Sequence, residues 1–248
     1  MKENEEKKPL TKGKALLSKI AFTAYVFALI LATCFSVFIW FQKTYFTAYW
    51  VNGQSMWPTL NKEAKTAKGE YFNDDISGKS MVNATDIDYI IGDEHQNVID
   101  HLKRFDIIIC KYTPTDTYEK IKRIIALPGE TFYIDKTVPG DPANGVIHLL
   151  NKETNKYEVL EQPLDTQYIC VGTYPDKTAT PFTLGPDEYF VMGDNRKHSS
   201  DSRENPPVKK SEINAKAVAL VARCKTVPVT GQISLRASEV RYMWPRWL

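Results

Sequence analysis

The sequence predicts an all-β domain that follows a single N-terminal transmembrane helix. Three observations support this fold class: an uncharged apolar run near the start, short β-rich segments after it, and no long amphipathic helix pattern in the remainder. With 248 residues, 43% of them hydrophobic, the chain is large enough to bury a substantial core, which excludes global disorder. We expect a tail at 1–19, the helix at 20–42 and the domain at 43–248.

The apolar run from Ile20 to Phe41 contains 22 residues and no charge. A helix of that length rises about 33 Å, enough to cross a hydrocarbon core of about 30 Å. A cleavable signal peptide is the alternative, but its apolar region is usually about 7 to 15 residues long and ends at a small-residue cleavage site. This run is longer and continues into Gln42 and Lys43, which favours a retained membrane anchor.

The charges around this run predict the orientation of the chain. Six lysines precede the helix and only Lys43 follows closely, so the positive-inside rule places the N-terminus in the cytoplasm and the domain outside it. Removing residues 1–43 from the chain's 32 basic and 30 acidic side chains leaves 25 and 27, a net charge of −2. A nucleic-acid partner requires a basic face, so none is expected for this domain.

Aromatic side chains occur at both ends of the domain. The segment 45–50 contains four of them directly after the helix, where such rings suit the headgroup layer of a bilayer. The C-terminal segment 242–248 is also aromatic, and two interpretations of it stay open. Either its rings, with Met56 and Trp57, form an apolar rim facing lipid, or they fill the core.

Short segments rich in β-branched and aromatic residues recur through the domain, separated by turn-forming residues. We expect strands at 106–112, 120–127, 131–135, 145–150, 167–172, 188–192 and 216–224. The polar stretch 61–103 is weakly periodic, so we expect one early strand, a mobile excursion and a turn or two of helix at 97–103.

The cysteines and histidines form no metal-binding pattern. Cys34 lies in the apolar run, and Cys110, Cys170 and Cys224 are widely spaced, so buried thiols in strands are expected, and whether two of them pair stays open. The four histidines lack His-Glu-x-x-His spacing, so no zinc is expected.

The stretch NGQSMWPTL at 52–60 places Ser55 between a glycine and a proline. A serine becomes a nucleophile when a nearby base removes its proton, and no histidine here lies in a recognisable triad motif. Lysine is an alternative base if burial lowers its pKa. In EKIKRIIALPGE, strand alternation puts Lys122 and Ile124 on one face, although a lysine on a strand is more often a solvated outer residue.

Four motifs carry a family resemblance. GQSMWPTL, KRIIALPGE and VMGDNRKHSSDSR, in this order after one membrane helix, resemble the boxes of type I signal peptidases, and RFDIIICKY resembles their intermediate strand box. These enzymes are membrane-anchored Ser-Lys endopeptidases that remove signal peptides from exported preproteins. The motifs span 53–203, so the resemblance covers most of the domain. It implies that family's antiparallel β-sheet fold, signal peptides and the lipid bilayer as partners, and no metal or cofactor.

The resemblance implies roles residue by residue. Ser55 matches the nucleophile and Lys122 the general base, with Met56 lining the substrate pocket. Ser199 matches the serine that orients the lysine amine, and Ser200, one position off the pattern, is the alternative. The charged residues that match a cluster supporting the site by mutual pairing are Asp194, Arg196, Asp201, Arg203 and Arg123. The alternative for the two arginines in the last motif is a surface ion pair worth under about 1 kcal/mol.

Three residues depart from the family pattern or modify it. Gly53 stands where some members carry an oxyanion-hole serine, as in the Gram-positive branch, so the backbone N–H of Ser55 becomes the main donor and the second donor stays open. Phe105 replaces a glycine common before Asp106, which questions the turn geometry there. Lys120 lies on the same side of an ideal strand as the base, where its charge either lowers the base's pKa or reaches solvent.

The resemblance also predicts a substrate geometry and leaves other functions open. A substrate is expected to lie as an extended strand at a sheet edge, with small side chains, typically alanine, at the first and third positions before the cut. A smaller, non-catalytic β insertion is expected at about 136–187, because this segment separates the lysine strand from the GDNR box (193–196). The alternatives are an accessory or dedicated peptidase with other substrates, and a membrane-tethered binding module without activity.

Overall fold

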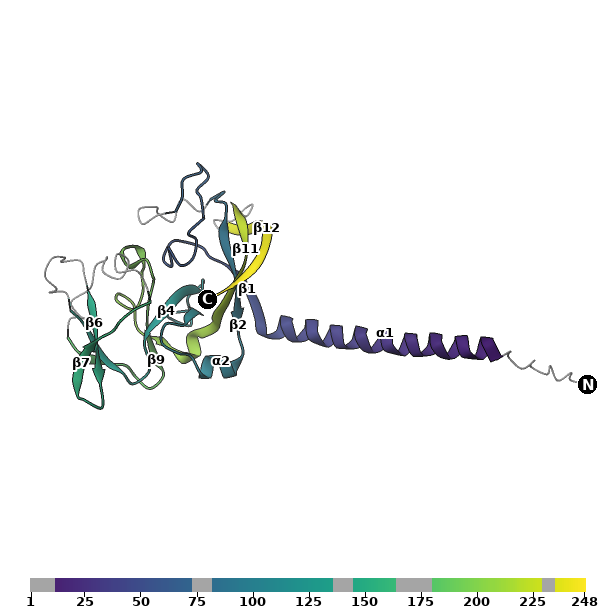
Figure 1. The fold of residues 1–248 in the computed structure, drawn as a ribbon. Coiled ribbons are helices and arrows are strands. Elements are labelled where there is room, and N and C mark those ends of the chain that lie inside the picture. Colours follow the sequence, from purple (N-terminus) through teal and green to yellow (C-terminus); the bar gives the residue numbers. More distant parts are fainter. Residues whose placement is uncertain (1–11, 73–81, 136–144, 164–179, 229–234) are drawn as a thin grey trace, which may run out of the picture. The chain divides into compact units, whose positions relative to one another are not determined.

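The computed structural model describes residues 12–72, 82–135, 145–163, 180–228 and 235–248 (Figure 1). The chain divides into two compact units, Met1–Tyr45 and Phe46–Leu248. The first contains helix α1 (Lys12–Tyr45), which begins earlier than the predicted start at 20. Within it, Leu16–Trp40 has a mean hydropathy of 2.3 and is long and apolar enough to cross a membrane. Its apolar side chains are exposed, as lipid-facing side chains are.

The second unit contains an eight-stranded sheet in which every pairing is antiparallel. The strand order is β1-β2-β11-β3-β4-β9-β10, and β12 pairs with β11. The strands are β1 (Phe46–Trp50), β2 (Ile87–Asp93), β3 (Ile107–Cys110), β4 (Lys120–Ala126), β9 (Glu188–Met192), β10 (Val208–Lys209), β11 (Ile213–Pro228) and β12 (Leu235–Trp247). Helix α2 (Gln96–Asp100) lies in the segment where a turn or two was expected, and η3 (Arg196–His198) and η4 (Lys210–Glu212) are short 3₁₀ turns.

A smaller antiparallel sheet has the strand order β7-β6-β5-β8. Its strands are β5 (Thr131–Asp135), β6 (Val146–Asn151), β7 (Lys156–Val159) and β8 (Phe182–Thr183). Figure 1 shows β6 and β7 on the side of this unit remote from β11 and β12. Phe132 joins the two sheets, since its ring centroid lies 4.4 Å from that of Phe182 and 4.7 Å from that of Phe190 on β9.

The predicted fold class is confirmed: one N-terminal apolar helix precedes a mostly antiparallel β domain. Strands occur in six of the predicted segments, at β3, β4, β5, β6, β9 and β11, and the early strand is β2. The predicted strand 167–172, and with it Cys170, lies outside the described residues. Strands β1, β7, β8, β10 and β12 were not predicted, because tertiary pairing rather than an alternating apolar pattern holds them in extended form.

The two aromatic segments differ in burial. Tyr49 on β1 packs against the core, and its hydroxyl donates a 2.9 Å hydrogen bond to Glu94. On β12, Tyr242, Trp244 and Trp247 are 81%, 92% and 77% exposed, which excludes the core interpretation for these rings. Met56 is 1% exposed and belongs to the core, so it takes no part in an exposed rim.

The central strand β3 and its neighbour β11 carry buried cysteines. All four residues of β3 are buried, as expected for a continuous apolar run that is covered on both faces. Cys110 and Cys224 are free thiols, and burial raises their pKa to about 12 and about 11. Both thiols are therefore unreactive at neutral pH, in agreement with the expectation of buried thiols in strands for these two residues.

Candidate active site

A tight loop after β1 presents Ser55. Gly53 adopts φ 119°, a left-handed conformation in which residues other than glycine are strained. Directly after the serine, Met56 and Leu60 are 1% and 0% exposed in the core, and Leu60 N–H donates to Met56 O at 2.9 Å. The hydroxyl therefore belongs to a segment that is anchored by core packing on its C-terminal side.

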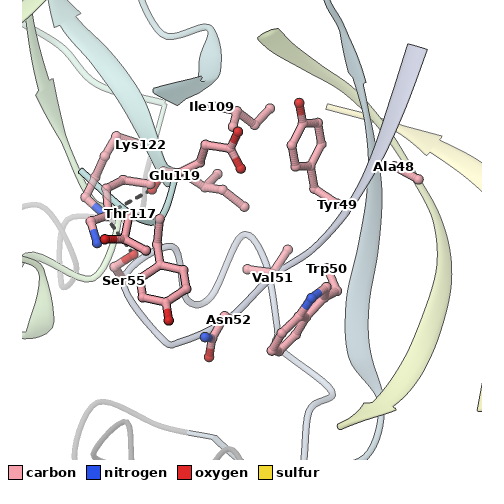
Figure 2. A pocket seen from close by; sticks show the side chains of 13 residues that line it. Ala48, Tyr49, Trp50, Val51, Asn52, Ser55, Ile109, Thr117, Glu119 and Lys122 are labelled. Atoms are coloured by element: carbon pink, nitrogen blue, oxygen red, sulfur yellow. Dashed lines mark hydrogen bonds between the residues drawn. The ribbon is translucent and has the colours of Figure 1, made fainter. Parts of the chain in front are cut away.

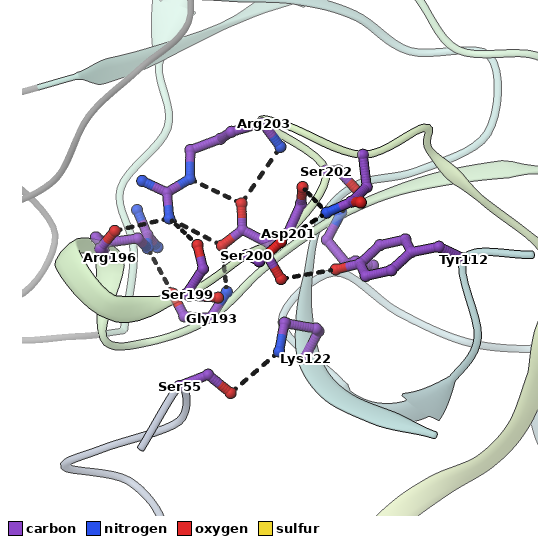
Figure 3. Close-up of polar contacts among 12 residues, drawn as sticks. Ser55, Tyr112, Lys122, Gly193, Arg196, Ser199, Ser200, Asp201, Ser202 and Arg203 are labelled. Atoms are coloured by element: carbon purple, nitrogen blue, oxygen red, sulfur yellow. Dashed lines mark hydrogen bonds and ion pairs between the residues drawn. The ribbon is translucent and has the colours of Figure 1, made fainter. Parts of the chain in front are cut away.

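Lys122 lies on β4 with its side chain aimed at Ser55 (Figure 3). Its Nζ is 3.0 Å from Ser55 Oγ and 3.1 Å from the carbonyl oxygen of Ile121, and the residue is 3% exposed. Burial lowers the pKa of Lys122, and the nearby charge of Lys120 lowers it further, whereas Asp201 and Asp194 act in the opposite direction. A buried amine of this kind can accept a proton from the serine hydroxyl.

A cleft of about 450 Å³ opens beside these two side chains (Figure 2). The end of β1 with the residues after it, 48–52, and the segment 117–122 contribute most of its lining, together with Ser55 and Ile109. Figure 2 shows Ser55 and Lys122 at one side of the cleft and Tyr49 at the other. Residues of β1 and of β4 thus contribute to the lining of the cleft beside Ser55. Met56 is not among its lining residues, so the predicted pocket role of that side chain receives no support.

The charged cluster consists of two buried ion pairs. Arg123 donates from Nε and Nη2 to the Asp194 carboxylate at 2.8 and 2.6 Å. Arg203 donates to Asp201 at 2.7 and 2.9 Å, and Asp201 also accepts from Gly193 N–H at 2.9 Å. Burial alone would raise the pKa of Asp201, but the hydrogen bonds and charge of Arg203 hold that pKa below its usual value. Arg203 is 2% exposed, so a surface ion pair is excluded.

Arg196 does not join this ion pairing, contrary to the sequence prediction. It is 2% exposed, and its Nε donates to the carbonyl oxygen of Gly193 at 2.9 Å. Its Nη2 donates to the side-chain oxygen of Gln162. Within the part of the chain that the structure describes, no carboxylate pairs with it. Arg196 thus stabilises the backbone of the GDNR box through a carbonyl oxygen, and it does not neutralise a carboxylate of the cluster.

The two candidate orienting serines lie in different surroundings. Among the described residues, no hydrogen bond joins Ser199 to Lys122; the Ser199 hydroxyl packs against Gly193 instead. The Ser200 hydroxyl accepts a 3.0 Å hydrogen bond from Asn205 at the exposed surface. The role of Ser199 in orienting the amine stays a prediction.

The structure answers the question about the turn at Phe105, whereas the second oxyanion donor that Gly53 leaves open stays open. No described residue accepts a hydrogen bond from Ser55 N–H, so this donor is available to an oxyanion. Phe105 adopts φ 71°, the left-handed region that favours glycine, and its N–H donates to Ile124 O at 2.9 Å. The turn before β3 therefore forms in spite of the larger side chain.

Sequence reasoning missed backbone contacts made by the GDNR box. Asn195 N–H donates to the carbonyl oxygen of Ser55 at 3.0 Å, which ties this box directly to the Ser55 loop. Gly193 leaves room for that contact. The motif itself was visible in the sequence, but it gave no indication that the backbone, rather than the charged side chains, touches the serine.

Replacing Gly193 by alanine is expected to lower turnover strongly. A Cβ at this position would lie 2.4 Å from Ser55 O and 2.2 Å from Ser199 Oγ, so the Ser55 backbone must shift. A misplacement of about 1 Å at a nucleophile costs on the order of 100-fold in rate. Single-turnover cleavage of a peptide substrate measures the loss. Gly185→Ala is the matched control, because the three atoms nearest to its Cβ belong to the flexible Glu188 side chain. Unchanged turnover in Gly193→Ala would contradict the expected shift of Ser55.

Comparisons with known proteins agree with the motifs. The profile of the family described as signal peptidase, peptidase S26, matches residues 21–222. Signal peptidase I T of Bacillus subtilis (strain 168) is 29% identical over 200 residues, which cover 80% of this chain and 84% of that protein. Signal peptidase I P of Bacillus subtilis subsp. natto is 30% identical over 168 residues, covering 67% of this chain and 72% of that protein. A crystal structure of a signal peptidase I from Enterococcus faecalis V583 is 27% identical, with a TM-score of 0.28, and covers 47% of this chain and 96% of that chain.

Proposed function

The chain belongs to the signal peptidase family, peptidase S26, and from this premise we propose that it removes signal peptides from exported preproteins with Ser55 as nucleophile and Lys122 as general base. The observation that carries the assignment of the two residues is the 3.0 Å contact between Ser55 Oγ and the buried amine of Lys122. A membrane-tethered binding module would not need an amine kept from water beside a hydroxyl.

The catalytic cycle follows from the positions of these groups. Uncharged Lys122 accepts the Ser55 proton while Oγ attacks the scissile carbonyl carbon, and Ser55 N–H stabilises the oxyanion. The resulting ammonium gives its proton to the departing amine, which leaves the signal peptide as an ester on Ser55. Lys122 then takes a proton from a water molecule, whose oxygen attacks the ester and releases the signal peptide, and the Lys122 ammonium returns the proton to Ser55 Oγ.

The cleft suits an extended substrate. A signal peptide lying between β1 and the segment 117–122 can pair with exposed backbone on both sides, and this pairing does not depend on sequence. Side chains such as Tyr49, Ile109 and Ile121 limit the space in the cleft. This limited space agrees with the preference that the family resemblance implies, alanine-like side chains at the first and third positions before the cut.

The membrane helix accounts for where cleavage takes place. We infer that α1 anchors the chain, with its N-terminus in the cytoplasm and residues from about 43 onward on the opposite side. This orientation rests on the excess of lysines before the helix. We place the smaller sheet, β5 to β8, in a supporting rather than catalytic role, since none of its residues lines the cleft.

The pH dependence of cleavage tests the proposed base. The reactive form of Lys122 is uncharged, and burial lowers its pKa from the ordinary value of 10.5. The value of kcat/KM is therefore expected to rise about tenfold per pH unit and to level off at a pKa well below that value. The measurement uses the full chain in detergent micelles with a preprotein substrate. An inflection at the pKa of free lysine, or a flat profile, would refute the assignment of Lys122.

A further inference from the structure

Asn61 is a buried polar residue at the end of the Ser55 loop. It is 0% exposed and adopts φ 61°, a left-handed conformation that asparagine tolerates better than most residues. Its side-chain Nδ2 donates to Val51 O at 2.9 Å and to Gly53 O at 2.7 Å. The side chain thus binds the loop at two points before the serine, although it follows the serine in sequence.

Asn61 also makes two hydrogen bonds to Asp88, which attach the Ser55 loop to the eight-stranded sheet. Asn61 Oδ1 accepts from the N–H of Asp88 on β2 at 2.9 Å, and Asn61 N–H donates to Asp88 Oδ2 at 2.6 Å. Asp88 is 2% exposed and lies 3.5 Å from Arg223 on the neighbouring strand β11. The two residues exchange reciprocal hydrogen bonds, so they act as one clamp that ties the loop to β2, which pairs with β1 on one side and β11 on the other.

The clamp sets the orientation of the Gly53–Gln54 peptide group, one peptide before the one that carries the Ser55 N–H. A trans peptide is planar, and its C=O and N–H point in opposite directions. Because Asn61 holds Gly53 O, the N–H of Gln54 in the same peptide must face away from Asn61. Gly53, with φ 119°, has few steric restraints of its own, so an external contact is needed to hold one orientation.

We propose that Asn61 is a positioning residue, held by Asp88, which fixes the Ser55 loop in the geometry needed for attack. The inference rests on the proposed function of Ser55. An amide suits this place because it supplies two donors for two carbonyls and one acceptor for a backbone N–H, whereas aspartate would turn an acceptor towards the carbonyls.

The test is Asn61→Gly in the full chain. Glycine accepts the left-handed backbone without strain, so this variant removes the side-chain clamp alone. We expect kcat for preprotein cleavage to fall about 100-fold, with KM changed by less than about threefold. The pKa seen in the pH profile is expected to stay at the wild-type value, because Lys122 remains buried. A general loosening of the fold would instead hydrate the amine and move that pKa upward.

Two controls separate positioning from lost stability. Asn155→Gly changes an exposed asparagine with φ 52° in the turn between β6 and β7, so it matches the backbone change and should leave kcat intact. Thr226→Ala removes a buried hydroxyl that bonds the backbone of Ala84, so it lowers the melting temperature without touching the loop. We expect Thr226→Ala to keep wild-type kcat at a temperature where it is folded.

The outcomes distinguish the inference from the proposed function. If the wild-type chain cleaves no preprotein, the proposed function fails. If the wild type cleaves and Asn61→Gly is folded with wild-type kcat, or loses kcat only with a shifted pKa, the positioning role is overturned. If Asn61→Gly shows no cooperative melting, Asp88→Ala decides instead: it leaves the Asn61 side chain in place, and the proposal requires a kcat loss of about tenfold.

Discussion

Replacing Ser55 by alanine is expected to lower preprotein cleavage by about ten-thousand-fold or more while the domain stays folded. The proposed reaction loses its nucleophile, and among the described residues no second hydroxyl forms a hydrogen bond with Lys122. The only hydrogen bond of the Ser55 side chain in that part of the chain is the one with Lys122. Loss of this hydrogen bond is expected to lower the free energy of unfolding by about 1 kcal/mol and the melting temperature by about 2–4 °C. Cleavage of a full-length preprotein and thermal melting measure the two effects.

Ser200→Ala is the matched control for this experiment. The Ser200 hydroxyl is bound to Asn205 at the surface, so its removal should leave turnover within about twofold of wild type. Wild-type turnover in a folded Ser55→Ala protein would exclude Ser55 as the nucleophile.

Replacing Lys122 by methionine is expected to abolish cleavage to a similar degree and, at neutral pH, to stabilise the fold. Methionine is unbranched and of similar length, so it fills the space of the lysine side chain without an amine to desolvate. In the wild type, burial lowers the pKa of Lys122 in the folded chain below its value of 10.5 in the unfolded chain. At a pH between these two pKa values, folding therefore releases a proton from Lys122. The variant avoids that cost and should gain about 1 kcal/mol in the free energy of unfolding.

The stability gain has a defined pH dependence. It is full below the lowered folded pKa of Lys122 and disappears as the pH rises towards 10.5, where the unfolded lysine also loses its proton. Denaturant unfolding at several pH values measures it. Lys120→Met is the matched control on the same strand: the base remains, so cleavage should persist, with a slightly higher pKa in the rate profile because the charge of Lys120 is absent. Cleavage retained in Lys122→Met would contradict the dyad.

The elements with strong local signals could be predicted from the sequence. The uncharged run gave α1, and the apolar segments gave β3, β4, β5, β6, β9 and β11. These signals are local: a strand buried on one face alternates apolar and polar residues, and a strand buried on both faces is a continuous apolar run. Strand β12 lacked such a signal, since its rings at Tyr242, Trp244 and Trp247 are exposed.

The candidate site was predicted mainly where motifs name chemically distinctive side chains. Ser55, Lys122 and the pairs Arg123–Asp194 and Arg203–Asp201 lie together as expected. Arg196 was placed in the wrong kind of contact, because an arginine can bind a carbonyl as readily as a carboxylate. Asn61 was missed altogether, since one asparagine in a polar stretch has no spacing that distinguishes it.

By itself, the sequence determined that this chain has an apolar anchor, a β-rich domain and the motifs of a serine-lysine peptidase. Only the tertiary structure decided that Lys122 is buried against Ser55, that backbone of the GDNR box contacts the Ser55 carbonyl, and that Asn61 and Asp88 hold the Ser55 loop. The reason is physical: composition and period act within a few residues, whereas desolvation and hydrogen-bond geometry depend on which strands the fold brings side by side.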